Sequence, residues 1–262
     1  MNRRGTPARY PQPAGEVRDG ASPMSKLFEE LDYRVTPMGA LSLWRRRDLA
    51  RNVDIYEIRL GDDYLMSSRF TEAETALATL ALDALRGRAL DVVVGGLGLG
   101  YTAEAVLTNP AVRSLHVIEA LPEVIEWHQR GLLPLGAGLT SDARCRLVAG
   151  DFFALLAAPD GGFDPDRPGR RFDAVLVDID HSPQSLLHPS HAAFYRPEGL
   201  RGLARHLRSG GVFGLWSNDP PEDAFLAALA EAFATAEARV VRFPAPSREG
   251  EAANTVYLAR AH

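Results

Sequence analysis

The feature that most constrains the fold of this chain is an apolar run that ends in a cluster of glycines. Residues 90–95 read Leu-Asp-Val-Val-Val-Gly, and a helical pattern begins at residue 102. A continuous apolar run of this length is typical of a strand buried on both faces of a parallel sheet. The segment therefore predicts a buried strand, a tight turn and a helix start. Four glycines fall within six positions of that turn: Gly95, Gly96, Gly98 and Gly100.

Glycines suit such a turn because the backbone can bend sharply and approach a ligand with no Cβ in the way. The unpaired N–H groups at the start of the following helix favour an anionic or polar ligand group. Gly96, Gly98 and Gly100 give the spacing G-x-G-x-G. A turn of this kind can also serve packing alone, so support for a binding site has to come from the rest of the chain.

Composition narrows the class of protein. The 262-residue chain is 46% hydrophobic and 24% charged, which is typical of a globular protein with one large domain or a domain and a small appendage. No apolar run approaches the roughly 20 residues that span a bilayer, and the first residues lack an apolar signal core. We therefore expect a cytoplasmic protein without a membrane partner.

Cysteine count and charge exclude further classes. Cys145 is the only cysteine, so disulfides within the chain and cysteine-based metal sites are excluded. The net charge of −5 gives no support to broad nucleic-acid binding. Two short basic clusters, residues 45–47 and 170–171, are interpreted as solvated surface.

The chain divides into three expected parts. Residues 1–23 are rich in Pro, Gly, Arg and polar residues without periodicity, which predicts a disordered tail. Residues 24–70 predict a small antiparallel β unit of about four strands, because residues 53–60 alternate with period two between turn signals. Residues 71–262 predict the larger domain, which opens with a helix capped by Thr71 and running to about residue 85.

The larger domain alternates strands and helices. Strands are predicted at residues 90–95, 114–119, 144–148, 172–177 and 212–216. Helices are predicted at residues 101–108, 122–130, 152–157, 192–207 and 222–233. Two final strands, at residues 240–243 and 255–259, predict a terminal antiparallel hairpin. The fold class is therefore α/β, with a doubly wound, Rossmann-like parallel sheet.

In such sheets, ligands bind at the carboxyl ends of the strands. In this sequence, acidic residues follow those ends. Glu119 ends the second strand, about 20 residues after the glycines, where a carboxylate can accept hydrogen bonds from ribose hydroxyls. Asp151 follows the third strand and can accept from an adenine amino group, and Asp178 ends the fourth. Together they predict a pocket for an adenosine-type ligand. Its expected residues are Gly95, Gly96, Gly98, Gly100, Glu119, Asp151 and Asp178.

Four segments in order, residues 95–100, 117–125, 142–153 and 172–178, resemble the spermidine synthase family within the class I S-adenosylmethionine (SAM) methyltransferase fold. The resemblance covers about residues 30–260. It implies that Glu119 binds the ribose, that Asp151 binds the adenine, and that Asp178 lies at the transfer site. It also implies SAM or decarboxylated SAM as cofactor, and a homodimer supported by the N-terminal β unit.

Three departures from the family pattern bear on the reaction. Aminopropyltransferases of the family carry an aspartate at the position of Gly98. Their turn after the fourth strand reads D-S-S-D-P, whereas residues 178–183 read Asp-Ile-Asp-His-Ser-Pro here. They also have a Tyr-His pair before the first core strand, which is absent from residues 70–80. Decarboxylated SAM has no carboxylate, so an aspartate can receive its ammonium group, whereas the carboxylate of intact SAM would be repelled. The turn therefore favours methyl transfer from SAM to a small, amine-bearing acceptor. Aminopropyl transfer is the alternative.

Asp178, Asp180 and His181 are the predicted catalytic residues, because they can orient or deprotonate an amine and histidine titrates near neutral pH. The alternative for Asp180 and His181 is a solvated turn with local caps. His181, His188 and His191 lie close in sequence, but Pro189 breaks any helix through them and no carboxylate pattern completes a set, so we expect no metal. A non-catalytic nucleoside-binding protein is the alternative of a different class.

Overall fold

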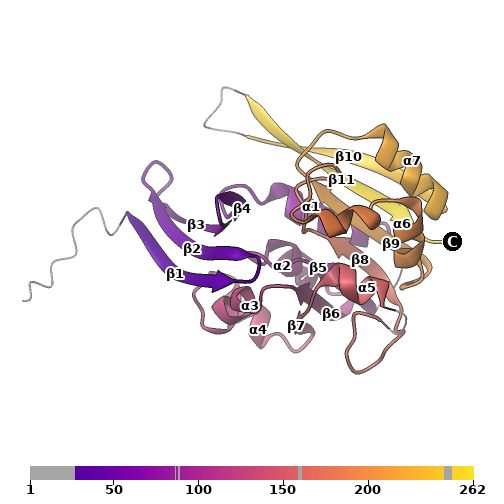
Figure 1. The fold of residues 1–262 in the computed structure, drawn as a ribbon, viewed down its shortest axis with the longest axis horizontal. Helices are drawn as coiled ribbons and strands as arrows, with labels where there is room; N and C mark the ends of the chain where they lie inside the picture. The colour runs from indigo at the N-terminus through magenta and orange to yellow at the C-terminus, as the bar shows by residue number, and fades with distance from the viewer. Residues whose placement is uncertain (1–26, 86, 88, 159–160, 245–249) are drawn as a thin grey trace, which may run out of the picture.

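The computed structural model describes residues 27–85, 87, 89–158, 161–244 and 250–262, so the tail predicted at residues 1–23 lies outside the described residues. These parts form a four-stranded antiparallel sheet and a seven-stranded, mostly parallel sheet. Figure 1 shows the smaller sheet at one end of the molecule and the larger sheet with its helices in the remainder. No helix in the described ranges is long and apolar enough to span a bilayer.

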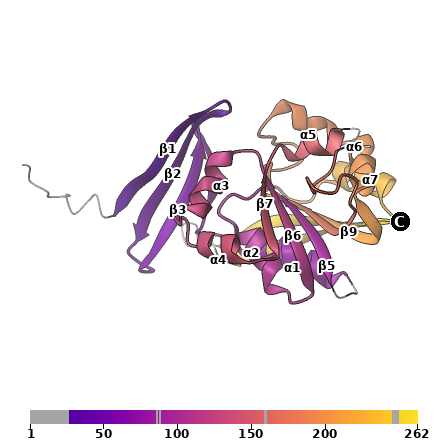
Figure 2. The same cartoon turned by 90° about the horizontal axis from the view of Figure 1, so that it is seen from below.

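The smaller sheet contains four strands paired in chain order, as the sequence predicts. They are β1 (Phe28–Thr36), β2 (Gly39–Asp48), β3 (Val53–Leu60) and β4 (Asp63–Ser67). Leu41, Leu43 and Ile58 are buried in the same apolar cluster as one face of the larger sheet. The indole N–H of Trp127 donates to Asp32 of β1 at 2.7 Å, which ties the smaller sheet to α3 (Pro122–Gln129). Figure 2 shows α3 beside this sheet.

The larger sheet has the strand order β10-β11-β9-β8-β5-β6-β7. Five strands run parallel: β5 (Leu90–Gly95), β6 (Val112–Glu119), β7 (Cys145–Ala149), β8 (Phe172–Val177) and β9 (Leu207–Ser217). β10 (Thr235–Pro244) and β11 (Glu251–Arg260) form an antiparallel hairpin, and β11 pairs antiparallel with β9. The α/β fold with an antiparallel C-terminal hairpin and an N-terminal β unit is confirmed.

Helices cover both faces of this sheet because alternate strand residues point to opposite sides. Val92 and Val94 of β5 join the cluster that includes residues of α1 (Glu72–Asp83), α2 (Tyr101–Thr108), α3 (Pro122–Gln129) and α4 (Gly136–Ser141). Val93 joins the opposite cluster, which includes residues of α5 (Phe152–Ala157), α6 (Pro197–Ala204) and α7 (Asp223–Ala232). The sheet is thus doubly wound, as predicted.

The prediction of a single helix at residues 192–207 is wrong. A 3-10 helix, η2 (Pro189–Ala193), comes first, α6 begins at Pro197, and β9 begins at Leu207. Proline has no N–H to donate, and it disfavours helical geometry in the residue before it. Arg196 accordingly has the extended angles φ −89° and ψ 159°.

Two further details of the helices differ from the sequence prediction. The sequence does not predict helix α4, because its glycines are poor helix formers. Thr71 precedes α1 as expected, but its side chain makes no capping hydrogen bond. Its N–H instead donates to the carboxylate of Glu72 at 2.9 Å.

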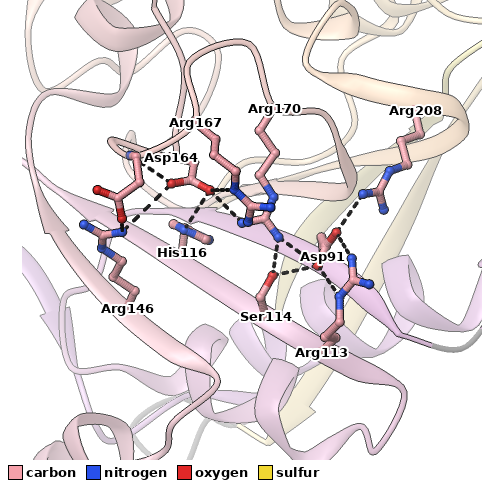
Figure 3. Close-up of polar contacts among 10 residues, drawn as sticks. Asp91, Arg113, Ser114, His116, Arg146, Asp164, Arg167, Arg170 and Arg208 are labelled. Carbon is pink, nitrogen blue, oxygen red and sulfur yellow. Dashed lines mark hydrogen bonds and ion pairs between the residues drawn. The ribbon is translucent and has the colours of Figure 1, made fainter.

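A charged network joins strands at the amino edge of the larger sheet, opposite the glycine turn (Figure 3). The guanidinium of Arg170 pairs with Asp91 at 2.9 Å and with Asp164 at 2.8 Å. Burial alone would raise the pKa of Asp91, but hydrogen bonds from Arg113, Ser114 and Arg208 hold it well below its usual range. The side chain of Arg170 is only 10% exposed, so the prediction of solvated surface at 170–171 is wrong for this residue.

Candidate functional site

A cavity of about 840 Å³ lies at the carboxyl ends of the parallel strands, and residues of β3 and β4 from the N-terminal sheet line it as well. This is the edge at which the fold predicts a ligand, and the volume is typical of small-molecule and cofactor sites. Across the described parts of the chain, no three His, Cys, Asp or Glu side chains gather as metal ligands would. The carboxyl, imidazole and amide side chains of the cavity wall are Glu74, Glu119, Asp151, Asp178, His181, His188, His191, Asn218 and Asn254.

The glycine turn lies against this cavity, and its four glycines have two different structural roles. Gly96 and Gly98 line the cavity, with φ angles of 93° and 46° that side-chain-bearing residues rarely adopt. A Cβ on Gly96 would collide with the carbonyl oxygen of Asp178. Gly95 and Gly100 do not line it: a Cβ there would meet the Phe152 ring or Leu139 at 2.6 Å. Gly95 and Gly100 therefore allow close packing of neighbouring side chains and do not face the cavity.

Glu119 ends β6 and supports the glycine turn. Its Oε2 accepts the N–H of Leu97 at 2.9 Å, and its Oε1 accepts the N–H of Leu121 at 2.9 Å. Burial raises the pKa of Glu119, while these backbone donors act in the opposite direction. The backbone N–H groups of Gly98 and Ala120 also act on this carboxylate, and Glu119 lines the cavity.

Asp151 is the N-cap of α5 and faces the cavity at the same time. Its Oδ1 accepts the N–H groups of Phe153 at 2.8 Å and Ala154 at 3.1 Å. Its Oδ2 has no hydrogen-bond partner within the described ranges. The cap explains why an acid stands here, and the second oxygen is available to a ligand.

Asp178 and Glu74 place two carboxyl groups in one region of the wall. Asp178 follows β8 and accepts the hydroxyl of Thr102 at 2.7 Å. Burial raises the pKa of Asp178 to about 6, against the effect of the Thr102 hydrogen bond. Burial and the negative charge of Asp178 raise the pKa of Glu74 to about 8. The two groups therefore hold about one proton between them near neutral pH.

Sequence reasoning missed Glu74, although a signal was available. Leu77, Ala78, Ala81 and Leu82 form the buried stripe of α1, and Glu74 falls on that stripe at helical spacing. An acid on the apolar face of a helix is unusual, because burying a charged group is costly unless something balances it.

The turn after β8 separates two residues that the sequence predicts to act together. His181 lines the cavity, and its carbonyl oxygen accepts the N–H of Asn218 at 2.7 Å. Asp180 is buried and does not line the cavity. Its carboxylate accepts hydrogen bonds from the hydroxyl of Tyr195 at 2.8 Å and from the ring of His191. Asp180 therefore lies neither in a solvated turn nor in direct contact with the cavity, the two placements considered from the sequence.

The N-terminal sheet and the C-terminal strands complete the wall. Met66 of β4 lies over Gly98, and its Sδ accepts the N–H of Leu99 at 2.9 Å. Trp216 of β9 lines the cavity. Asn254 of β11 lines it as well. Elements from both ends of the chain therefore enclose the site.

No model of a protein family matches the chain. Putrescine N-methyltransferase 3 of Nicotiana tabacum is 30% identical over 121 residues, which are 46% of this chain and 28% of that protein. Polyamine aminopropyltransferase 2 of Streptomyces coelicolor is 34% identical over 98 residues, which are 37% of this chain and 16% of that protein. The match therefore spans less than a third of the length of either relative.

Among solved structures, the spermidine synthase of Thermotoga maritima superposes with a TM-score of 0.65 at 17% identity, over 89% of this chain and 73% of that one. This likeness shows the fold. The chain therefore shares the fold of spermidine synthase, and its partial sequence matches are to putrescine N-methyltransferases and polyamine aminopropyltransferases. These similarities agree with the resemblance to the spermidine synthase family seen in the sequence.

Proposed function

We propose that this chain binds SAM in the cavity and transfers its methyl group to a small, amine-bearing acceptor. The observation that carries the proposal is the pair of buried carboxyl groups, Glu74 and Asp178, in one wall of the cavity. Two carboxylates that are buried together repel each other, and a nearby positive charge stabilises them. A sulfonium and a protonated amine both supply such a charge.

The residues of the wall fit SAM along its length. Gly96 and Gly98 line the cavity, and Glu119, which lines it as well, is the proposed acceptor for ribose hydroxyls. The Oδ2 atom of Asp151 suits an adenine amino group. When bound, SAM supplies a sulfonium that activates the attached carbon toward a nitrogen lone pair.

Asp178 is the proposed base for the acceptor amine. A protonated amine has no lone pair, so it must lose a proton before it can attack. With a pKa of about 6, Asp178 is ionised at neutral pH, and Thr102 occupies only its Oδ2. Asp178 can therefore attract the amine and take its proton. His181 also lines the cavity and is the next candidate for this role.

Two observations bear on the choice between methyl and aminopropyl transfer. Gly98 leaves the turn without the acid that would receive the ammonium group of decarboxylated SAM, and Met66 fills the space above it. This favours intact SAM. Aminopropyl transfer is the second candidate, because Glu74 is an acid from another element that faces the same cavity and is able to receive that ammonium group.

Product analysis separates these candidates. The protein is incubated with putrescine as probe acceptor and with either SAM or decarboxylated SAM, and products are identified by mass spectrometry. A methylated amine formed from SAM supports the proposal, and an aminopropylated amine formed from decarboxylated SAM overturns it in favour of the second candidate. Binding of both nucleosides without any product from a panel of amines indicates a nucleoside-binding protein.

We also propose that residues 24–70 act as a unit through which two copies associate. Phe28, Tyr33 and Val35 of β1 are exposed, and Val35 is 81% exposed. An apolar sheet surface of this kind is typical of an interaction site. A strictly monomeric mass at high micromolar concentration would contradict the dimer.

A further inference from the structure

A buried carboxylate holds one histidine of the cavity wall in a fixed orientation. Asp180 has no exposed side-chain surface, and its oxygens accept from the hydroxyl of Tyr195 and from the N–H of Leu187. The third partner is Nδ1 of His191, at 2.8 Å from Oδ1. A carboxylate only accepts, so Nδ1 carries the hydrogen and Nε2 is the acceptor of the neutral ring.

This histidine lies at the Asp151 end of the cavity. The rings of His191 and Phe153 are 4.0 Å apart between centroids. The N–H of Phe153 donates to Oδ1 of Asp151, so Phe153 connects the two residues. All three line the cavity. Neither Nε2 of His191 nor Oδ2 of Asp151 has a hydrogen-bond partner in the part of the chain that the structure describes.

We propose that His191, positioned by Asp180, determines the nucleobase that this site accepts. The inference rests on the proposed function, in which Asp151 binds adenine. Two acceptors at one end of a cavity match an exocyclic amino group, which has two N–H donors. Hypoxanthine carries a carbonyl oxygen at that position, so both protein acceptors would face another acceptor. A site built to accept hydrogen bonds rejects an analogue that lacks the donors.

The test compares S-adenosylhomocysteine with S-inosylhomocysteine by calorimetric titration of the full chain. His191→Phe keeps a ring against Phe153 and removes the acceptor nitrogen. It should weaken adenosyl binding about tenfold and lower the adenosyl-over-inosyl preference about tenfold, the scale of one lost hydrogen bond. Asp180→Asn should lower the same preference, because it loosens the ring without touching the ligand.

The matched control makes the same substitution at a histidine outside the cavity. The ring of His206 packs against that of Phe163, with 5.1 Å between centroids, and neither residue lines the cavity. His206→Phe should therefore retain the adenosyl-over-inosyl preference of the wild-type protein. An equal loss of preference in His206→Phe and His191→Phe would show a general effect of the substitution and overturn the assignment to His191.

A ligand-side measurement keeps the proposal falsifiable where a variant fails to fold. An N6-methyl derivative of S-adenosylhomocysteine has one N–H donor fewer, and the wild-type protein should bind it about tenfold more weakly. Unchanged preference in a folded His191→Phe protein, or equal binding of the N6-methyl ligand, overturns the inference while adenosyl binding leaves the proposed function standing. Absence of adenosyl binding by the wild-type protein would instead remove the proposed function.

Discussion

Glu74 of α1 and Asp178 at the end of β8 lie in one cavity wall and compete for a single proton. The pKa of Glu74 is raised to about 8 and that of Asp178 to about 6, in both cases mainly by burial. At neutral pH the pair therefore carries one negative charge, on Asp178, beside one neutral carboxyl group. The negative charge attracts a cation, and the ionised carboxylate of Asp178 can accept a proton from it.

The raised pKa of Glu74 predicts a pH-dependent stability in the ligand-free protein. Between the unfolded pKa of about 4.3 and the folded value of about 8, the folded state binds more protons than the unfolded state. Stability from this group is therefore complete below the lower value and is lost as pH rises through the higher one. Glu74→Gln should remove this slope and stabilise the protein at pH 8 by roughly 1–3 kcal/mol. Urea unfolding of both proteins at pH 5 and pH 8 measures it, and parallel slopes would contradict the assignment.

Asp178→Asn tests the proposed base. The amide keeps the shape and removes the charge, so turnover should fall by about 10²–10⁴. Binding of S-adenosylhomocysteine should stay within roughly threefold, because Glu119 and Asp151 are the proposed nucleoside contacts. Steady-state kinetics and calorimetry give the two values. Intact turnover would transfer the role to His181, and loss of folding would make Asp178 a structural cap.

Thr102→Val tests the same assignment through the pH profile. The Thr102 hydroxyl lowers the pKa of Asp178, so its removal should raise that pKa further. A base works only when ionised, and the acidic limb of kcat should therefore move to higher pH. An acidic limb at the same pH in wild-type and variant profiles would show that Asp178 does not control it.

The network at the amino edge of the sheet predicts a contrast between two arginines that share Asp164. Arg170 is 10% exposed and joins Asp164 to Asp91, whereas Arg167 is 65% exposed and contacts Asp164 at 3.1 Å. Arg170→Ala leaves buried carboxylates with fewer partners and should destabilise the fold by roughly 3–5 kcal/mol. The control Arg167→Ala should cost at most about 1 kcal/mol. Equal unfolding free energies for the two variants would contradict the structural role of Arg170.

The strand-end residues of the site are predictable because their placement depends on local pattern. Once the sequence shows where a parallel strand ends, Glu119, Asp151 and Asp178 must meet at one edge. The direction of each side chain within a turn is not predictable in this way. The sequence therefore predicts Asp180 at the acceptor, whereas its carboxylate lies behind the wall.

Contacts between elements that are distant in the sequence could not be predicted either. Glu74 meets Asp178 only after α1 packs on the sheet, and nothing in residues 71–85 alone identifies that partner. His191 reaches the cavity because η2 and α6 are separate, where the sequence predicts one helix. Both residues depend on tertiary packing, which a pattern of single residues does not encode.

Calorimetric titration of the wild-type protein with SAM and with decarboxylated SAM tests the central claim most directly. The turn around Gly98 contains no acid, so no side chain of the turn repels the carboxylate of SAM. We predict tighter binding of SAM, and we predict that a folded Gly98→Asp variant shifts the preference toward the decarboxylated form. Tighter binding of decarboxylated SAM by the wild-type protein would contradict methyl transfer and establish the aminopropyl alternative.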